Sequence, residues 1–120
     1  MNPQVVQPEL EAEFFTPERC FILEVWNEES DPSVSIARSR VTSGVTTERH
    51  SLDVDERYIV VGGWGEMQVG VGESTTIGPG DIVVIPRGVP QRVRNTGSDD
   101  LVFYCVCSPR FRPDGYQALE

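Results

Sequence analysis

Short apolar stretches with alternating side chains, broken by turn-forming residues, follow one another through most of the chain. The stretches 20–27 and 33–41 each predict a strand, the first because it is rich in β-favouring residues and the second because it alternates with period two. Further strands are predicted in the segments RYIVV, EMQVGVGE, DIVVIP, QRVRN and DLVFYCVC. Glycine, proline and aspartate fill the intervals, and no segment from 20 to 107 has a helical period. This spacing is typical of an all-β sandwich or barrel.

The same pattern predicts where the barrel begins and ends. Residues 1–19 mix proline, glutamine and glutamate with few apolar positions, which predicts an N-terminal arm or an edge element. The barrel is expected over 20–108, and the proline-punctuated residues 109–120 predict a C-terminal tail. Within 33–41, period two places small residues on one face, whereas the other face changes from apolar to basic.

Length and charge limit the kind of protein. A chain of 120 residues predicts a single domain. Its formal net charge of -9 leaves no basic stripe to neutralise phosphates, so neither nucleic acid nor an anionic membrane is expected as a partner. No apolar run approaches the roughly 20 residues of a membrane helix, and residues 1–15 lack the order of a signal peptide. A cytoplasmic protein is expected.

The three cysteines do not predict a disulfide framework, because their number is odd and the chain is acidic. Cys105 and Cys107 are separated by one residue, so in a strand both would face the same side. Three interpretations follow for them: metal ligands, a redox pair, or buried filler, the usual place of free cysteine.

Candidate chemistry centres on the only histidine. His50 stands six residues before Glu56. Side chains alternate along a strand, so an extended stretch would turn His50, Leu52, Glu56, Tyr58 and Val60 to one side, provided that residues 53–55 keep the register.

This stretch resembles the first motif of the cupins, in which glycine, two histidines, a glutamate and a final glycine follow at set spacings. The matching residues are Gly44, His50, Glu56 and Gly63, and Leu52 stands in the place of the second histidine. A later stretch resembles the second cupin motif, in which glycine, proline and glycine lead to histidine and asparagine. The matching residues there are Gly80, Pro86, Gly88 and Asn95, and Gln91 replaces the histidine. The resemblance implies a single-domain cupin barrel, that is, a double-stranded β-helix or jelly roll.

In metal-binding cupins the two histidines and the glutamate of the first motif and the histidine of the second hold the ion. The resemblance therefore implies His50, Glu56 and Gln91 as ligands of a divalent metal, either Fe, Mn, Ni or Zn. The metal would be bound weakly, because leucine cannot coordinate and an amide oxygen is a poorer donor than imidazole. The alternative is a hydrogen-bonded His50 at the barrel mouth without metal.

The barrel would enclose a pocket for a small-molecule ligand. Apolar walls with a few polar groups at one end are the usual composition of such sites. The residues expected to contact the ligand are Leu52, Val93, Phe103 and Cys105, with Glu56 and Tyr58 as catalytic residues.

Two functions fit these residues. One is an enzyme with isomerase, lyase or oxygenase-type chemistry on a small organic acid or sugar-like substrate, in which Glu56 acts as a ligand or proton shuttle. The other is a metal-free ligand-binding or accessory module without catalysis, which the loss of two ligand positions fits more simply. In either case a homodimer is expected, covering 33–41 or the N-terminal edge.

Overall fold

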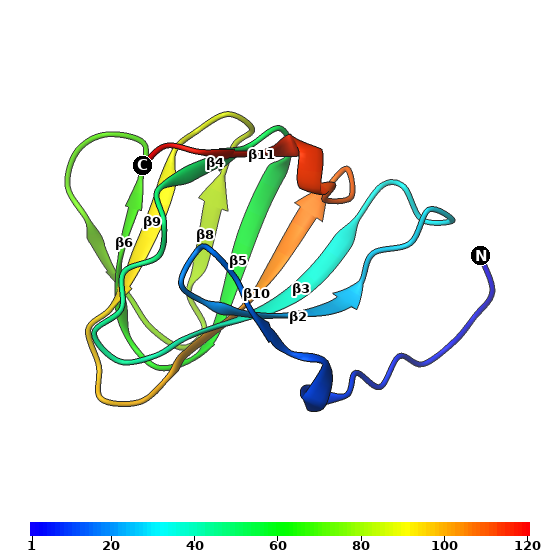
Figure 1. Ribbon diagram of the computed structural model, residues 1–120, viewed down its shortest axis with the longest axis horizontal. Helices are drawn as coiled ribbons and strands as arrows, with labels where there is room; N and C mark the ends of the chain where they lie inside the picture. The colour runs from blue at the N-terminus through cyan, green and yellow to red at the C-terminus, as the bar shows by residue number, and fades with distance from the viewer.

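The computed structural model describes residues 1–120 and consists of two antiparallel β-sheets that face each other (Figure 1). The larger sheet contains, in spatial order, β1 (Phe14–Phe15), β2 (Phe21–Trp26), β3 (Ser35–Val41), β10 (Leu101–Ser108), β5 (Asp55–Gly62) and β8 (Ile82–Ile85). The smaller sheet contains β11 (Tyr116–Ala118), β4 (His50–Leu52), β9 (Gln91–Asn95), β6 (Gly65–Val69) and β7 (Thr75–Ile77). The prediction of an all-β barrel is confirmed.

Alternation decides which side chains enter the space between the sheets. In β5, Glu56, Tyr58 and Val60 are buried, whereas Ile59 and Val61 are exposed on the outer face. In β9 the buried positions are likewise every second residue, and the intervening arginines are exposed. His50 and Leu52 of β4 are buried as well and line the same cavity as Glu56 and Tyr58, so these residues share the predicted common face.

The strand predicted at 33–41 forms as β3, but it does not lie at an edge. It pairs with β2 on one side and with β10 on the other. The residues 33–41 therefore offer no free backbone to a second subunit. The free edges of the larger sheet are β1 and β8.

Both ends of the chain contribute to the barrel. Within the segment predicted as an arm, β1 pairs with β2, after a short 3-10 helix at Leu10–Ala12. Within the predicted tail, a second 3-10 helix at Pro113–Gly115 leads into β11, which pairs with β4. Neither helix is long and apolar enough to cross a membrane.

The core occupies the space between the sheets. Its main cluster has eleven buried residues: Cys20, Val41, Tyr58, Val60, Met67, Ile77, Val83, Ile85, Val93, Leu101 and Phe103. A smaller cluster of Leu52, Val54 and Cys107 packs against Phe111 and Tyr116 from the C-terminal segment. The smaller cluster thus connects the last residues of the chain to the strand that carries His50.

Candidate functional site

One cavity of about 410 Å³ lies where β2, β3, β4, β5 and β10 meet the N- and C-terminal segments. Eleven of its twenty lining residues are hydrophobic. The volume falls within the range of small-molecule sites, which are mostly apolar with a few placed polar groups. The lining therefore matches the kind of pocket that the sequence predicted.

The structure brings most of the predicted site residues to this cavity. Those in its wall are His50, Leu52, Glu56, Tyr58, Phe103 and Cys105. Cys107 also lines it, so the inward face of β10 carries both cysteines. Val93 does not reach the cavity, because it is buried in the main core cluster with 1% of its surface exposed. Gln91 is not itself a lining residue and contacts two residues that are, Tyr58 and Glu56.

Gln91 connects two lining residues by hydrogen bonds. The Tyr58 hydroxyl donates to Gln91 Oε1, and Gln91 Nε2 donates to Glu56 Oε1 over 2.7 Å. The Cys107 thiol lies 3.7 Å from the other oxygen, Glu56 Oε2. The pairing of β10 with β5 sets this last contact, since Cys107 is the cross-strand partner of Glu56. The carboxyl group of Glu56 is therefore held in one orientation.

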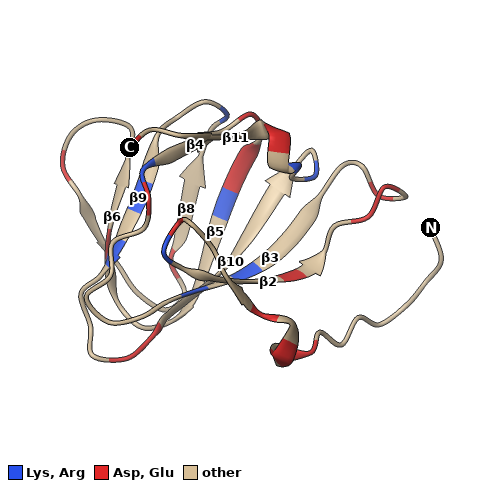
Figure 2. Ribbon diagram, viewed as in Figure 1, with Lys and Arg blue, Asp and Glu red and all other residues tan.

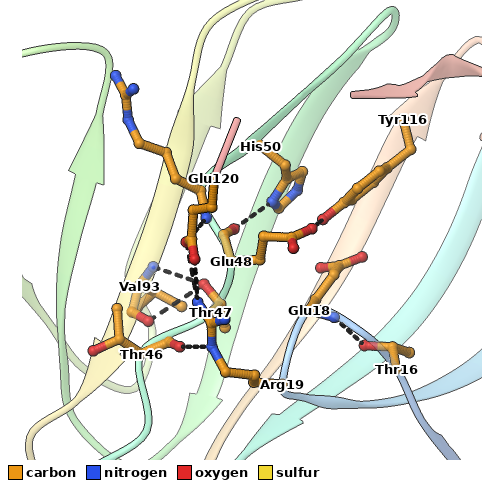
Figure 3. Close-up of polar contacts among 11 residues, drawn as sticks. Thr16, Glu18, Arg19, Thr46, Thr47, Glu48, His50, Val93, Tyr116 and Glu120 are labelled. Atoms are coloured by element: carbon orange, nitrogen blue, oxygen red, sulfur yellow. Dashed lines mark hydrogen bonds and ion pairs between the residues drawn. The ribbon is translucent and has the colours of Figure 1, made fainter. Parts of the chain in front are cut away.

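His50 is held by two contacts that fix its tautomer and ring plane. Its Nδ1 lies 2.8 Å from the carbonyl oxygen of Glu48, which can only accept, so Nδ1 carries the proton. The ring stacks on Tyr116 at 4.7 Å between centroids, and the Tyr116 hydroxyl donates to Glu48 Oε1 over 2.5 Å (Figure 3).

The second ring nitrogen of His50 faces the cavity. Nε2 makes no hydrogen bond within the chain, whereas every fully buried side-chain nitrogen and oxygen has a partner. Nε2 is therefore reached from the cavity that His50 lines, although only 4% of the residue is exposed. In the neutral ring this atom is an acceptor and a base.

Glu18 is a lining residue that the sequence analysis missed. It lies on a tight loop in which the Thr16 hydroxyl accepts the Glu18 backbone N–H and Arg19 has a φ of 70°. The Arg19 side chain donates to the Thr46 carbonyl and pairs with Glu120, which holds the loop against the barrel (Figure 3). The sequence signal was the TPER turn, but only long-range contacts direct Glu18 to the cavity.

Burial raises the pKa of two carboxyl groups in the wall, those of Glu56 and Glu18. For Glu56 desolvation is the largest cause, opposed by the hydrogen bond from Gln91 and by the charge of His50. For Glu18 desolvation again dominates, opposed by His50 and reinforced by Glu56 and Glu48. Burial also raises the pKa of Tyr58 and of the Cys105 thiol, so both remain protonated at neutral pH. Carboxyl groups of raised pKa in a cavity are suited to proton transfer.

The donor set does not fit a stably bound transition metal. Leu52 occupies one ligand position and cannot coordinate, and the amide oxygen of Gln91 already accepts the Tyr58 hydroxyl. No group of three or more histidine, cysteine, aspartate or glutamate side chains is placed to hold an ion. Of the ligands expected from the resemblance, Gln91 directs its amide to Tyr58 and Glu56, which leaves only His50 and Glu56 in the cavity wall.

The two facing sheets define a barrel of the double-stranded β-helix class. A family model described as the Cupin domain matches residues 38–107, and the chain belongs to the cupin family. The identification made from the two motifs is confirmed.

Solved structures share the whole fold. A Streptomyces PAC13 variant with uridine has a TM-score of 0.78 at 16% identity, covering 98% of this chain and 93% of that one. Pac13 is described as a nucleoside dehydratase. KdgF from Halomonas sp. has a TM-score of 0.73 at 21% identity, covering 85% of this chain and 90% of that one. At these identities the similarity shows the fold.

A curated relative shares part of its sequence with the chain. Endoribonuclease YbeY from Myxococcus xanthus (strain DK1622) is 33% identical over 86 residues, which cover 71% of this chain. The matched residues make up 29% of that protein, so the chain spans less than a third of its length.

Proposed function

We propose that the protein is a cupin enzyme that catalyses proton transfer on a small molecule, in an isomerase or lyase reaction, without a bound metal. The observation that carries the proposal is the placement of His50 Nε2 and the Glu56 carboxyl group in the wall of one cavity. In this reaction His50 Nε2 removes a proton from the substrate, and the Glu56 carboxyl group, whose pKa is raised by burial, takes part in the proton transfer beside it. Gln91 positions Glu56, and Tyr58 holds Gln91 in place.

The lining limits the substrate. No arginine lines the cavity, and the chain has no lysine, so a carboxylate or phosphate group would enter without a cationic partner. This argues against the organic acid among the substrates that the sequence analysis expected. Oxygenase chemistry is left out of the proposal because the donor atoms do not fit a redox metal.

Hydrogen exchange at carbon tests the proposal without a known substrate. The protein is incubated in D₂O with chelator and a panel of hydroxy-ketones, hydroxy-aldehydes and nucleosides including uridine, and NMR follows deuterium uptake and water loss. We expect the wild-type protein to exchange at least one compound. Glu56→Gln should lose about 100-fold or more of that rate, since general acid–base catalysis contributes about this much.

Glu73→Gln is the matched control, because Glu73 lies exposed on a loop away from the cavity and its loss changes the net charge equally. Full exchange by Glu56→Gln would contradict the role of the carboxyl group. Loss of exchange on adding chelator would contradict a metal-independent reaction. Absence of exchange with every compound would contradict the proposal that the protein is an enzyme.

Ligand binding without catalysis is the second candidate, and one observation favours it. Both oxygens of Glu56 are already engaged, one by Gln91 Nε2 and the other by the Cys107 thiol. Because these two contacts fix the Glu56 carboxyl group in one orientation, it is well suited to holding a bound ligand in one position. This candidate expects ligands that raise the melting temperature in chelator, by mass action on the native state, with no change in the ligand.

We also propose that the protein forms a homodimer through the outer face of β8. β8 is a free edge of the larger sheet, and Ile82 and Val84 expose 56% and 63% of their surfaces there. Ile59 and Val61 of the neighbouring β5 extend the same apolar face. A symmetric dimer would cover both the free backbone and these side chains.

A further inference from the structure

Every charged side chain that lines the cavity is acidic. Glu18, Glu24 and Glu56 lie in its wall. Figure 2 shows acidic positions on β2 and β5, the strands of Glu24 and Glu56. None of the ten arginines is among the lining residues. Arg57, which is adjacent to Glu56, points away and donates to the Ser108 hydroxyl over 2.7 Å. Apart from His50, the ionisable groups that a ligand's charge would meet in this wall are therefore acidic, with no arginine or lysine beside them.

Two polar groups in the wall that are free to meet a ligand, His50 Nε2 and the Glu18 carboxyl group, are acceptors. His50 Nε2 has no partner, and the residue is buried except for 4% of its surface. The Glu18 carboxylate makes only a weak contact of 3.9 Å with the Cys20 thiol. The only strong donor to Glu56 is the Gln91 amide, and that amide is not itself among the lining residues. A ligand that fills this end of the cavity must bring its own donors.

Aromatic rings form much of the remaining wall. Five of the ten aromatic residues of the chain line the cavity: Phe14, Tyr58, Phe103, Phe111 and Tyr116. Two of them, Tyr58 and Phe103, stack on each other with their centroids 4.1 Å apart. The faces of aromatic rings carry negative potential and attract cations. The aromatic rings and the acidic side chains of the wall thus both favour a cationic ligand.

We propose that the ligand is a small amine, bound as its ammonium ion between Glu18, Glu56 and His50 Nε2, with its apolar body against the aromatic wall. An ammonium group supplies several N–H donors and a positive charge, which match the acceptor atoms of His50, Glu18 and Glu56. A neutral hydroxyl supplies one donor and no charge. A carboxylate supplies neither and meets like charge.

This inference rests on the site of the proposed function, because it names the substrate class for the same residues. Three probes that share a cyclohexyl ring test the ligand class separately from the proposed catalysis: cyclohexylamine, cyclohexanol and cyclohexanecarboxylate. At neutral pH the amine is a cation, since alkylammonium groups lose their proton only near pH 10. Binding of each probe is measured by calorimetry and by NMR shifts of lining residues, with chelator present and no turnover required.

We expect the amine to bind at least about tenfold more tightly than cyclohexanol, and the carboxylate not to bind. Glu18→Gln should lower amine affinity several-fold and leave cyclohexanol affinity unchanged. Glu73→Gln, which removes one exposed charge outside the cavity, should change neither. A melting curve of each variant establishes that it is folded before its affinity is compared.

Equal affinity of the wild-type protein for amine and alcohol would overturn the inference, as would stronger binding of the carboxylate. Failure of all three probes to bind at about 10 mM would also overturn it, because a ligand of seven heavy atoms in a fitting cavity reaches this affinity. These outcomes need only the wild-type chain. A protein that binds the amine but exchanges no proton on any compound would contradict the proposed catalysis and leave the ligand class supported.

Discussion

The motif glycines show how single residues specify the turns of the barrel. Gly44 and Gly63 both have a φ of 80°, a conformation that costs other residues roughly 1–2 kcal/mol. A side chain at Gly44 would meet nothing within 4 Å, whereas a Cβ at Gly63 would lie within 3 Å of the Asp100 carbonyl oxygen and the Leu101 Cα. Backbone conformation therefore favours glycine at both positions, and at Gly63 the close approach of residues 100 and 101 also excludes a side chain.

Gly44→Ala and Gly63→Ala separate these reasons. We expect Gly44→Ala to lower the free energy of unfolding by about 1 kcal/mol, because only its backbone is strained. Gly63→Ala should lower it by about 3 kcal/mol or more, because the backbone around residue 100 must also move. Urea denaturation measures both, and equal losses would contradict the close approach at Gly63.

The buried carboxyl group of Glu56 gives stability a pH dependence of defined sign. Burial raises its pKa above the ordinary value of 4.5, so the folded state binds more protons than the unfolded state between the two values. This contribution is complete below pH 4.5 and is lost as pH rises through the raised pKa. His50, Gln91, Cys107, Cys105 and Glu18 act on the same group.

We therefore expect Glu56→Gln to flatten the fall of stability above pH 4.5, measured by urea denaturation across pH. Glutamine has nearly the same shape and still accepts the Gln91 amide, so packing is preserved. Glu73→Gln should retain the wild-type slope. If the stability of Glu56→Gln changed with pH in parallel with that of the wild type, burial would not raise the pKa of Glu56.

At the scale of elements, β11 supports the site from the C-terminal segment. Tyr116 stacks on His50 and donates a hydrogen bond to Glu48. We expect Tyr116→Phe to cost about 1 kcal/mol by loss of this hydrogen bond, and Tyr116→Ala about 2–3 kcal/mol by loss of the stack as well. Tyr104, whose hydroxyl makes no hydrogen bond within the chain, is the control. Its change to Phe should leave the melting temperature unchanged.

Alternation predicted the faces of these elements but not the depth of each residue along the barrel. It placed His50, Glu56 and Tyr58 on one inward face, as observed. It also turned Val93 inward, but β9 carries that residue past the cavity into the core. Glu18 escaped prediction for a different reason: its loop is held by contacts to residues 46 and 120, which no local pattern encodes.

At the scale of the whole molecule, the exposed apolar face of β8 predicts association. We expect light scattering to give the mass of two chains at about 10 μM, within the range of stable dimers. Val84→Glu should give one chain, because it places charge in the proposed interface. Val71→Glu, at a position 89% exposed in a loop, should remain dimeric. A wild-type monomer would contradict the dimer.

The core and the cavity occupy largely separate parts of the barrel. Eight of the eleven residues in the main core cluster do not line the cavity, and only Cys20, Tyr58 and Phe103 belong to both. Substitutions in the part of the cavity wall that belongs to neither core cluster leave the packing of both clusters in place. A lineage can therefore change its ligand by a few point mutations without first gaining stability elsewhere, which makes this barrel a tolerant starting point for new specificities in evolution and in the laboratory.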